Sequence, residues 1–155
     1  MARVEVVDTG SPWIISRSLV IQAPADRIFA LLADPRRHTD FDGSGSVRGA
    51  VSGPARLSMG AKFGMAMRLG VPYRVSSQVK EFEEGRRIAW AHLGGHRWRY
   101  ELESLPDGST RVTETFDATT ARSAKALKLM DAYSRNARAI EETLPRLAAL
   151  AESEA

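Results

Sequence analysis

The segment from residue 123 to residue 151 shows the clearest helical periodicity in the chain. Its apolar side chains recur at steps of three and four residues, which places them on one face of a single long helix. These side chains are Leu127, Met130, Tyr133, Ala137, Ile140, Leu144 and Leu147. The charged side chains that lie off this face are Lys125, Lys128, Arg135, Arg138, Glu141 and Glu142. A helix with one apolar face needs another apolar surface to lie on.

Residues 62–118 supply that surface, because their pattern is that of strands. Apolar residues alternate with polar ones, as in Phe63, Met65 and Met67, and alternation places them on one face of a sheet. Turn-forming residues recur at short intervals, around 70–72, 84–85, 94–95 and 106–108. No helical crossover separates these strands, so we expect an antiparallel meander of four or five of them.

The N-terminal part of the chain predicts one strand followed by two short helices. A segment rich in β-formers, 13–22, ends at Pro24, and proline suits the first turn of the helix that follows. Pro35 ends this helix, and 35–41 forms a second short one. A glycine-rich stretch, 43–60, has one short strand near 47–51. The fold class is therefore α+β. Without a linker or repeat, residues 1–155 are expected to form one domain.

The charge and hydropathy of the chain bear on whether it binds nucleic acid or inserts into a membrane. The 22 basic and 19 acidic residues are interspersed, and the net charge is only +3. In His96-Arg97-Trp98-Arg99-Tyr100, strand geometry sends the arginines and the aromatic rings to opposite faces, so we expect no nucleic-acid binding. The N-terminus does not resemble a signal peptide, and no apolar run approaches the ~20 residues needed to cross a bilayer. With no cysteines, a cytoplasmic protein without stable membrane insertion is expected.

Three segments resemble the polyketide cyclase/START-like superfamily, also called SRPBCC. They read IQAPADRIFALLADP at 21–35, VKEFEEGRRIAW at 79–90, and WRYEL at 98–102 continuing to DGSTRVT at 107–113. The resemblance implies a helix-grip fold, in which a curved antiparallel sheet wraps around the long C-terminal helix and encloses a hydrophobic cavity. Members bind lipids, hormones or polyketides, and a minority catalyse cyclisation or dehydration. No catalytic set is shared by the whole superfamily, so none is transferred to this chain.

The side chains expected to line such a cavity come from the inward positions of the strands and from the long helix. They are Phe63, Met65, Met67, Trp90, Trp98, Tyr100, Glu114, Phe116, Leu127, Met130 and Tyr133. Alternating apolar side chains can equally fill an ordinary core. If the helix-grip interpretation holds, the cavity should measure about 300–1,000 Å³, the usual range of ligand sites.

Glu114 is the one charged residue in this inward-facing set, and it lies between Val112 and Phe116 at strand spacing. Burial would disfavour its charged form and raise its pKa. It is therefore a candidate proton donor or acceptor, or an anchor for a ligand hydroxyl, with Tyr100 as its partner. The alternative is a purely structural hydrogen bond or ion pair near the rim.

The three histidines and the glycine-rich segment predict no metal or cofactor. A pair such as His92 and His96 falls short of the three protein ligands of a zinc site, and we expect both as exposed residues of a hairpin. A three-residue loop between them would place Trp90 opposite Trp98, whereas a two-residue turn would not; the longer loop is preferred. His38 is expected in a solvated loop. The 43–49 segment departs from the phosphate-binding glycine patterns.

Three functional hypotheses remain. The first is a carrier or sensor that binds a small apolar molecule, such as a lipid or polyketide, between sheet and helix. The second is a cyclase or dehydratase in which Glu114 and Tyr100 transfer protons. The third is a protein-interaction module whose interior is only core. The sequence leaves the ligand and the oligomeric state open.

Overall fold

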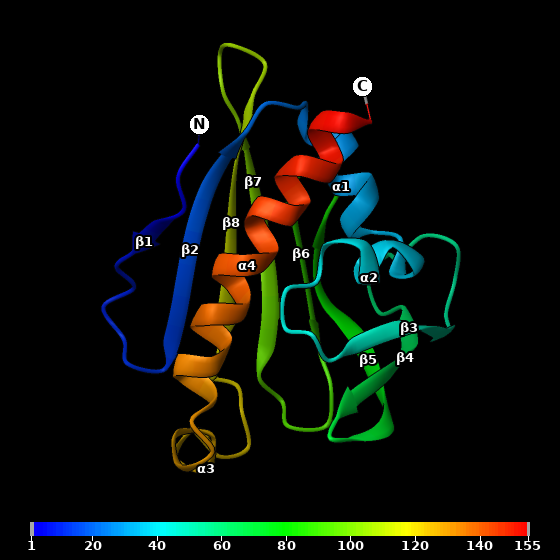
Figure 1. The fold of residues 1–155 in the computed structure, drawn as a ribbon, viewed down its shortest axis with the longest axis vertical. Coiled ribbons are helices and arrows are strands. Elements are labelled where there is room, and N and C mark those ends of the chain that lie inside the picture. The colour runs from blue at the N-terminus through cyan, green and yellow to red at the C-terminus, as the bar shows by residue number, and fades with distance from the viewer. Residues whose placement is uncertain (1, 155) are drawn as a thin grey trace.

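The computed structural model describes residues 2–154 of the chain. Its strands form an antiparallel sheet of eight, in the order β1-β2-β8-β7-β6-β5-β4-β3 (Figure 1). The strands are β1 (Glu5–Val7), β2 (Ile14–Ile21), β3 (Val47–Ser52), β4 (Lys62–Leu69), β5 (Val71–Glu83), β6 (Arg87–Ala91), β7 (Arg97–Ser104) and β8 (Thr110–Asp117). The consecutive hairpins from β4 to β8 confirm the predicted meander. Pairing of β2 with β8 then brings the first long strand beside the last.

Three short helical segments follow β2. They are α1 (Ala25–Leu32), the 3₁₀ turn η1 (Pro35–Arg37) and α2 (His38–Phe41). Pro24, in an extended conformation, directly precedes α1, and the Asp34 carboxylate accepts a hydrogen bond of 3.0 Å from the Arg36 amide at the start of η1. The predicted pair of short helices is therefore confirmed.

The predicted single C-terminal helix is wrong in one respect, because it is divided into α3 (Ala124–Leu129) and α4 (Ala132–Ser153). Asp131 separates the two with a left-handed backbone conformation, φ 56°. Aspartate tolerates this conformation better than most residues. The apolar periodicity therefore runs through both helices, although the chain changes direction between them. No helix in residues 2–154 is both long enough and apolar enough to cross a bilayer.

The structure settles the length of the β6–β7 loop, which the sequence left open, and adds one strand that the sequence did not predict. Trp90 lies opposite Trp98, which confirms the longer loop between β6 and β7. The short edge strand β1 was not predicted. It has three residues and exists only by pairing with β2, for example Val6 opposite Arg17.

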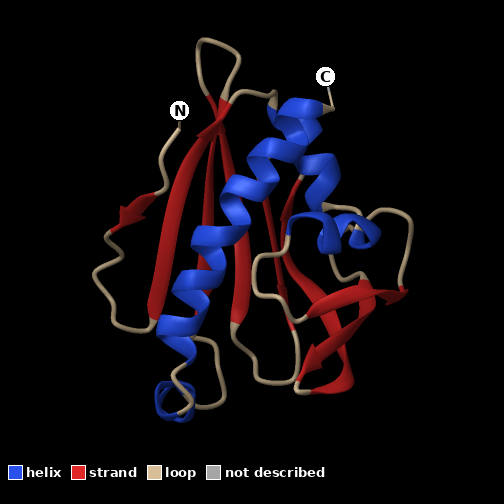
Figure 2. Cartoon of the chain, viewed as in Figure 1, coloured by secondary structure: helices blue, strands red, loops and turns tan. Residues whose placement is uncertain are grey.

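The helix α4 crosses the sheet diagonally, with α1 and α2 beside its C-terminal part (Figure 2). Its most extensive contacts are with β2, followed by α2 and β8, and it also contacts α1. This region is densely packed, since Ile28, Phe29, Leu32, Leu144 and Leu147 have no exposed surface. The strands β4 to β6 make no comparably extensive contact with α4, and the space beside its first half holds the site described next.

Candidate functional site

A cavity of about 590 Å³ lies between the inner face of the sheet, α2 and the first half of α4. Its volume is within the expected range. Most of the side chains selected from the sequence line it: Phe63, Met65, Met67, Trp90, Trp98, Tyr100, Glu114, Leu127 and Met130. The part of the wall formed by these nine side chains consists mainly of aromatic rings and flexible thioethers, which adapt to apolar molecules of irregular shape.

Phe116 and Tyr133, the remaining two selected residues, lie behind the wall and not on it. The Phe116 ring packs on Trp98, with 5.2 Å between ring centroids, and on Tyr133 at 5.7 Å. The Tyr133 hydroxyl donates a hydrogen bond of 3.0 Å to the Ala124 carbonyl oxygen. These two side chains therefore support the wall and join α3 to α4.

Glu114 and Tyr100 meet inside the cavity because they are directly opposite each other on β8 and β7. The Tyr100 hydroxyl donates a hydrogen bond of 2.9 Å to Glu114 Oε2. The second carboxyl oxygen, Oε1, is buried and has no hydrogen-bond partner among the described residues. Glu114 exposes only 3% of its surface, so the interior position predicted from the alternation is confirmed.

Burial determines the charge state of this pair. Removal from water raises the pKa of Glu114 well above its usual value, and the negative charge of Asp42 on the cavity wall acts in the same direction. The hydrogen bond from Tyr100 opposes this change but is the smaller effect. Burial also raises the pKa of Tyr100. This shift favours the neutral form of Glu114, which could donate a proton from Oε1 to an oxygen atom in the cavity.

His38 is not in a solvated loop, as the sequence suggested, but is buried in the cavity wall. Its ring stacks on Trp90 at 4.8 Å, and Nε2 lies 2.9 Å from the Leu32 carbonyl oxygen. A carbonyl can only accept, so Nε2 carries the proton. Burial lowers the pKa of His38 to about 4. The short helix α2 turns this ring inward. The basic residues beside His38 in the sequence had favoured an exposed position instead.

His92 and His96 also differ from expectation, since they are half-buried and line the cavity. Their rings meet at 4.8 Å, and His96 packs on Phe116 at 5.1 Å. Burial lowers the pKa of both, that of His96 to about 4. His92 is two residues after Trp90, and His96 is two residues before Trp98. The alternation of inward-facing positions therefore continues from each strand into the loop, and this spacing could have predicted the placement of both histidines.

Helix α4 contributes a second stripe that the sequence analysis missed. Small and uncharged residues recur at steps of four, three and four and line the cavity: Ala132, Asn136, Ala139 and Thr143. Arg135, Arg138 and Glu142 were placed off the apolar face, yet all three reach the cavity. Because α4 lies at the side of the cavity, its flank faces inward as well as its apolar stripe.

Gly43 closes the wall between α2 and β3. A Cβ atom at this position would lie 2.5 Å from Glu142 Cβ and 2.6 Å from the Thr143 amide nitrogen. The Gly43 amide donates a hydrogen bond of 2.8 Å to Thr143 Oγ1. Only glycine allows this close approach to α4. Gly43 is therefore required for packing of this segment against α4. Within residues 2–154, no group of three or more His, Asp or Glu residues is arranged to hold a metal ion.

The match to known proteins agrees with this architecture. A family described as polyketide cyclase / dehydrase and lipid transport matches residues 12–152. The chain belongs to this family. The uncharacterized protein Rv0088 of Mycobacterium tuberculosis is 48% identical over 152 residues, which cover 95% of this chain and 67% of that longer relative.

Solved structures share the fold at low sequence identity. A Rhodobacter sphaeroides protein has a TM-score of 0.74 at 16% identity, covering 97% of this chain and 99% of its own. The polyketide-cyclase-like protein Cgl2372 of Corynebacterium glutamicum has a TM-score of 0.61 at 21% identity, covering 93% and 95%. The helix-grip fold predicted from the sequence is therefore confirmed.

Proposed function

We propose that this protein binds a small, largely apolar metabolite, such as a lipid or polyketide, in the cavity, as a carrier or sensor. The observation that carries the proposal is the cavity itself, about 590 Å³ with aromatic and methionine walls. A chain that needed only a core would fill this space, because protein interiors are close-packed. Burying ~300 Å² of apolar ligand surface contributes roughly 7 kcal/mol before the costs of binding, enough for micromolar affinity.

The polar groups inside the cavity define the chemistry of the ligand more closely. A neutral Glu114 offers one proton donor, and Tyr100 holds it in place. A ligand oxygen that accepts a hydrogen bond, such as a carbonyl or hydroxyl, would satisfy Oε1, which has no partner in the described chain. An apolar ligand with one such oxygen fits better than a pure hydrocarbon, because a buried polar atom without a partner is costly.

A cavity-filling variant tests the proposal. Ala139 lines the cavity, whereas Ala149 lies on the exposed side of the same helix. We expect Ala139→Phe to abolish the rise in melting temperature that neutral lipids and aromatic polyketides cause, while Ala149→Phe retains it. Native mass spectrometry of the purified wild-type protein should detect a bound apolar molecule. If neither experiment detects a ligand, the interior is only core and the protein-interaction hypothesis gains support.

A second candidate function is catalysis of a cyclisation or dehydration, favoured by one observation. Glu114 is a buried acid whose free oxygen faces a cavity, with the Tyr100 hydroxyl beside it. Such a carboxyl can protonate a ligand carbonyl or remove a proton beside it. If the protein is an enzyme, Glu114→Gln should lower turnover by ~100-fold or more while binding survives. A carrier has no turnover to lose.

A further inference from the structure

Apolar side chains gather at one end of the molecule, around the mouth of the cavity. Of the eight large hydrophobic side chains that are exposed in the described chain, six belong to three neighbouring segments. These segments are the β4–β5 hairpin (66–75), the β6–β7 loop (92–96) and the region of α3 and the start of α4 (121–138), which Figure 1 shows at the same end. We call them the mouth segments. The six side chains are Leu69, Val71, Tyr73, Leu93, Leu129 and Met130.

The exposure of these six is too large to be incidental. Leu129 is 90% exposed and Leu93 is 81% exposed. Leu69, Tyr73 and Met130 also line the cavity, so the apolar surface continues from the outside into the interior. Exposed apolar side chains gathered at one end of a molecule are typical of a site of interaction.

The charge of the mouth segments is equally one-sided. They contain seven lysines and arginines and a single carboxylate, Asp131. The seven cations, all exposed, are Arg68, Arg74, Arg122, Lys125, Lys128, Arg135 and Arg138. Since the whole chain carries only +3, the remainder is net negative.

These cations also differ from the others in their partners. Every arginine that forms an ion pair in the described chain lies outside the mouth segments, for example Arg37 with Glu154 and Arg99 with Glu81. None of the seven mouth cations pairs with a described carboxylate. Their charge is therefore free to act on a partner.

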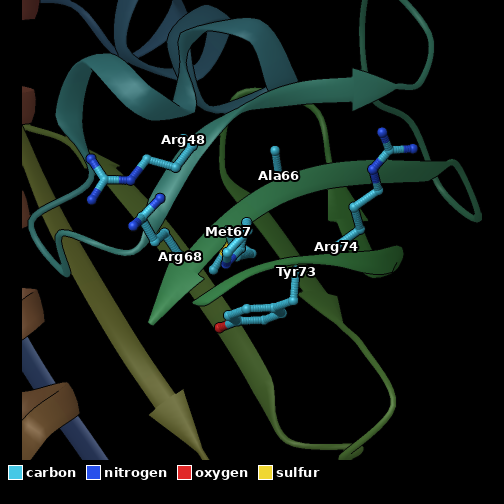
Figure 3. A pocket seen from close by; sticks show the side chains of 7 residues that line it. Arg48, Ala66, Met67, Arg68, Tyr73 and Arg74 are labelled. Atoms are coloured by element: carbon cyan, nitrogen blue, oxygen red, sulfur yellow. The ribbon is translucent and has the colours of Figure 1, made fainter. Parts of the chain in front are cut away.

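A hollow beside the mouth extends this basic surface. It measures about 560 Å³ and is lined by residues of β3, β4 and β5. Figure 3 shows Arg48 and Arg68 extending in the same direction, with the Tyr73 ring beside Met67. Tyr73 lines both this hollow and the main cavity. A phosphate group resting in the hollow would therefore lie next to the cavity mouth.

We propose that the mouth segments dock the protein on the surface of an anionic lipid membrane. Exposed aliphatic tips enter the boundary between headgroups and acyl chains, and the surrounding cations meet lipid phosphates. This is reversible peripheral binding and not insertion of a helix. A second copy of the chain is a poor occupant, because a symmetric contact would press seven cations against seven others. Nucleic acid gains little from aliphatic tips, since stacking needs aromatic rings.

Vesicle sedimentation tests the docking surface. We expect the protein to sediment with vesicles of phosphatidylcholine and phosphatidylglycerol in equal parts, and much less with pure phosphatidylcholine. Raising the salt concentration should weaken the binding, because salt screens exposed charges. Failure to sediment with the phosphatidylglycerol vesicles at low salt would overturn the proposal.

Two double variants separate the apolar and ionic contributions without touching the cavity. Leu93, Leu129, Lys125 and Lys128 do not line it. We expect Leu93→Ser with Leu129→Ser, and separately Lys125→Glu with Lys128→Glu, to weaken vesicle binding by about tenfold or more. Matched controls away from the mouth segments, Val6→Ser with Met59→Ser and Lys62→Glu with Lys80→Glu, should bind as the wild type does.

The remaining outcomes are also decisive. Equal binding by the mouth variants and the wild type contradicts the proposal. If the leucine variant binds normally, the lysine variant does not, and single-stranded DNA displaces the vesicles, the surface is a general polyanion site and docking on lipid is wrong. Ligand binding by Ala139→Phe and Ala149→Phe is measured without vesicles, so failure of docking and failure of the proposed cavity function are distinguishable.

Discussion

The two halves of α4 lie on the same sheet but have different surroundings. In the second half, Leu144 and Leu147 are fully buried, and the Ala151 carbonyl oxygen accepts a hydrogen bond from Arg27 of α1. The first half borders a cavity and presents small or polar side chains such as Asn136 and Ala139 to it. One helix therefore stabilises the fold at one end and leaves room for a ligand at the other.

The comparison explains why an imperfectly packed region persists in a chain of this size. A cavity forgoes dispersion contacts along its walls, and Glu114 and His38 add the cost of burying titratable groups. The densely packed half offsets these costs. Sites and packing cores are separated along the helix, so substitutions in one half should affect stability and those in the other should affect binding.

The largest expected effect is on packing in the second half of α4. Leu144→Ala should lower the free energy of unfolding by about 2–5 kcal/mol, because the new cavity is enclosed on all sides. Met67→Ala, on the wall of the existing cavity, should cost less than about 1 kcal/mol, since it removes few contacts. Urea unfolding at neutral pH measures both. Equal losses would contradict the difference between the two halves.

The next effect concerns acid stability and His38. Its folded pKa is about 4 against an ordinary value of 6.5, so the unfolded chain binds a proton more tightly. Stability due to the neutral ring is complete above pH 6.5 and is lost as the pH falls towards 4. The loss should be about 3 kcal/mol. In His38→Gln the pH dependence over this window should be shallower by that amount, as measured by unfolding at several pH values. If the stability of the two proteins changed with pH in parallel, the burial of a neutral His38 would not be the cause of the acid sensitivity.

Local patterns were sufficient to predict most of the fold. Alternation and recurrent turn residues gave the meander, and Pro24 and Pro35 gave the limits of α1. These features depend on near neighbours along the chain. The break at Asp131 was missed because the apolar periodicity continues across it, and the edge strand β1 was missed because it exists only by pairing with β2.

The candidate site was predictable on the strands and not on the helices. Strand alternation placed Phe63, Tyr100 and Glu114 correctly on the inner face. The flank of α4 could not be assigned, because an amphipathic helix reveals its buried face but not which neighbouring flank borders a void. The burial of His38 depends on stacking against Trp90, a residue far away in sequence.

A smaller effect is expected at the wall that joins α2 to α4. Gly43→Ala should destabilise the protein by about 1–3 kcal/mol, because its Cβ overlaps α4 and must displace the segment. Gly49→Ala is the matched control, since nothing lies within 4 Å of a Cβ built there. Chemical unfolding compares the two. An unchanged Gly43→Ala protein would mean that this wall moves freely.

The smallest expected effect concerns the hydrogen bond inside the cavity. Glu114→Gln preserves the shape of the side chain, and its amide can still accept from Tyr100 through oxygen and donate through nitrogen. If a neutral Glu114 donates to a ligand oxygen, the affinity for a carbonyl-containing ligand should change by only about 0.5–1.5 kcal/mol. Isothermal titration with a ligand identified by native mass spectrometry measures this change.

Tyr100→Phe provides the control for Glu114→Gln, because it removes the hydroxyl that holds the carboxyl while leaving the acid in place. Its effect on affinity should be of the same order, since a positioning contact is lost but the donor remains. A loss of a hundredfold or more in Glu114→Gln alone would have a different meaning. It would show that the bound state requires a charged carboxylate paired with a cationic ligand, because an amide can replace a hydrogen bond but cannot replace a negative charge. The neutral-donor mechanism would then be wrong, and the cavity would belong to a site selective for apolar amines.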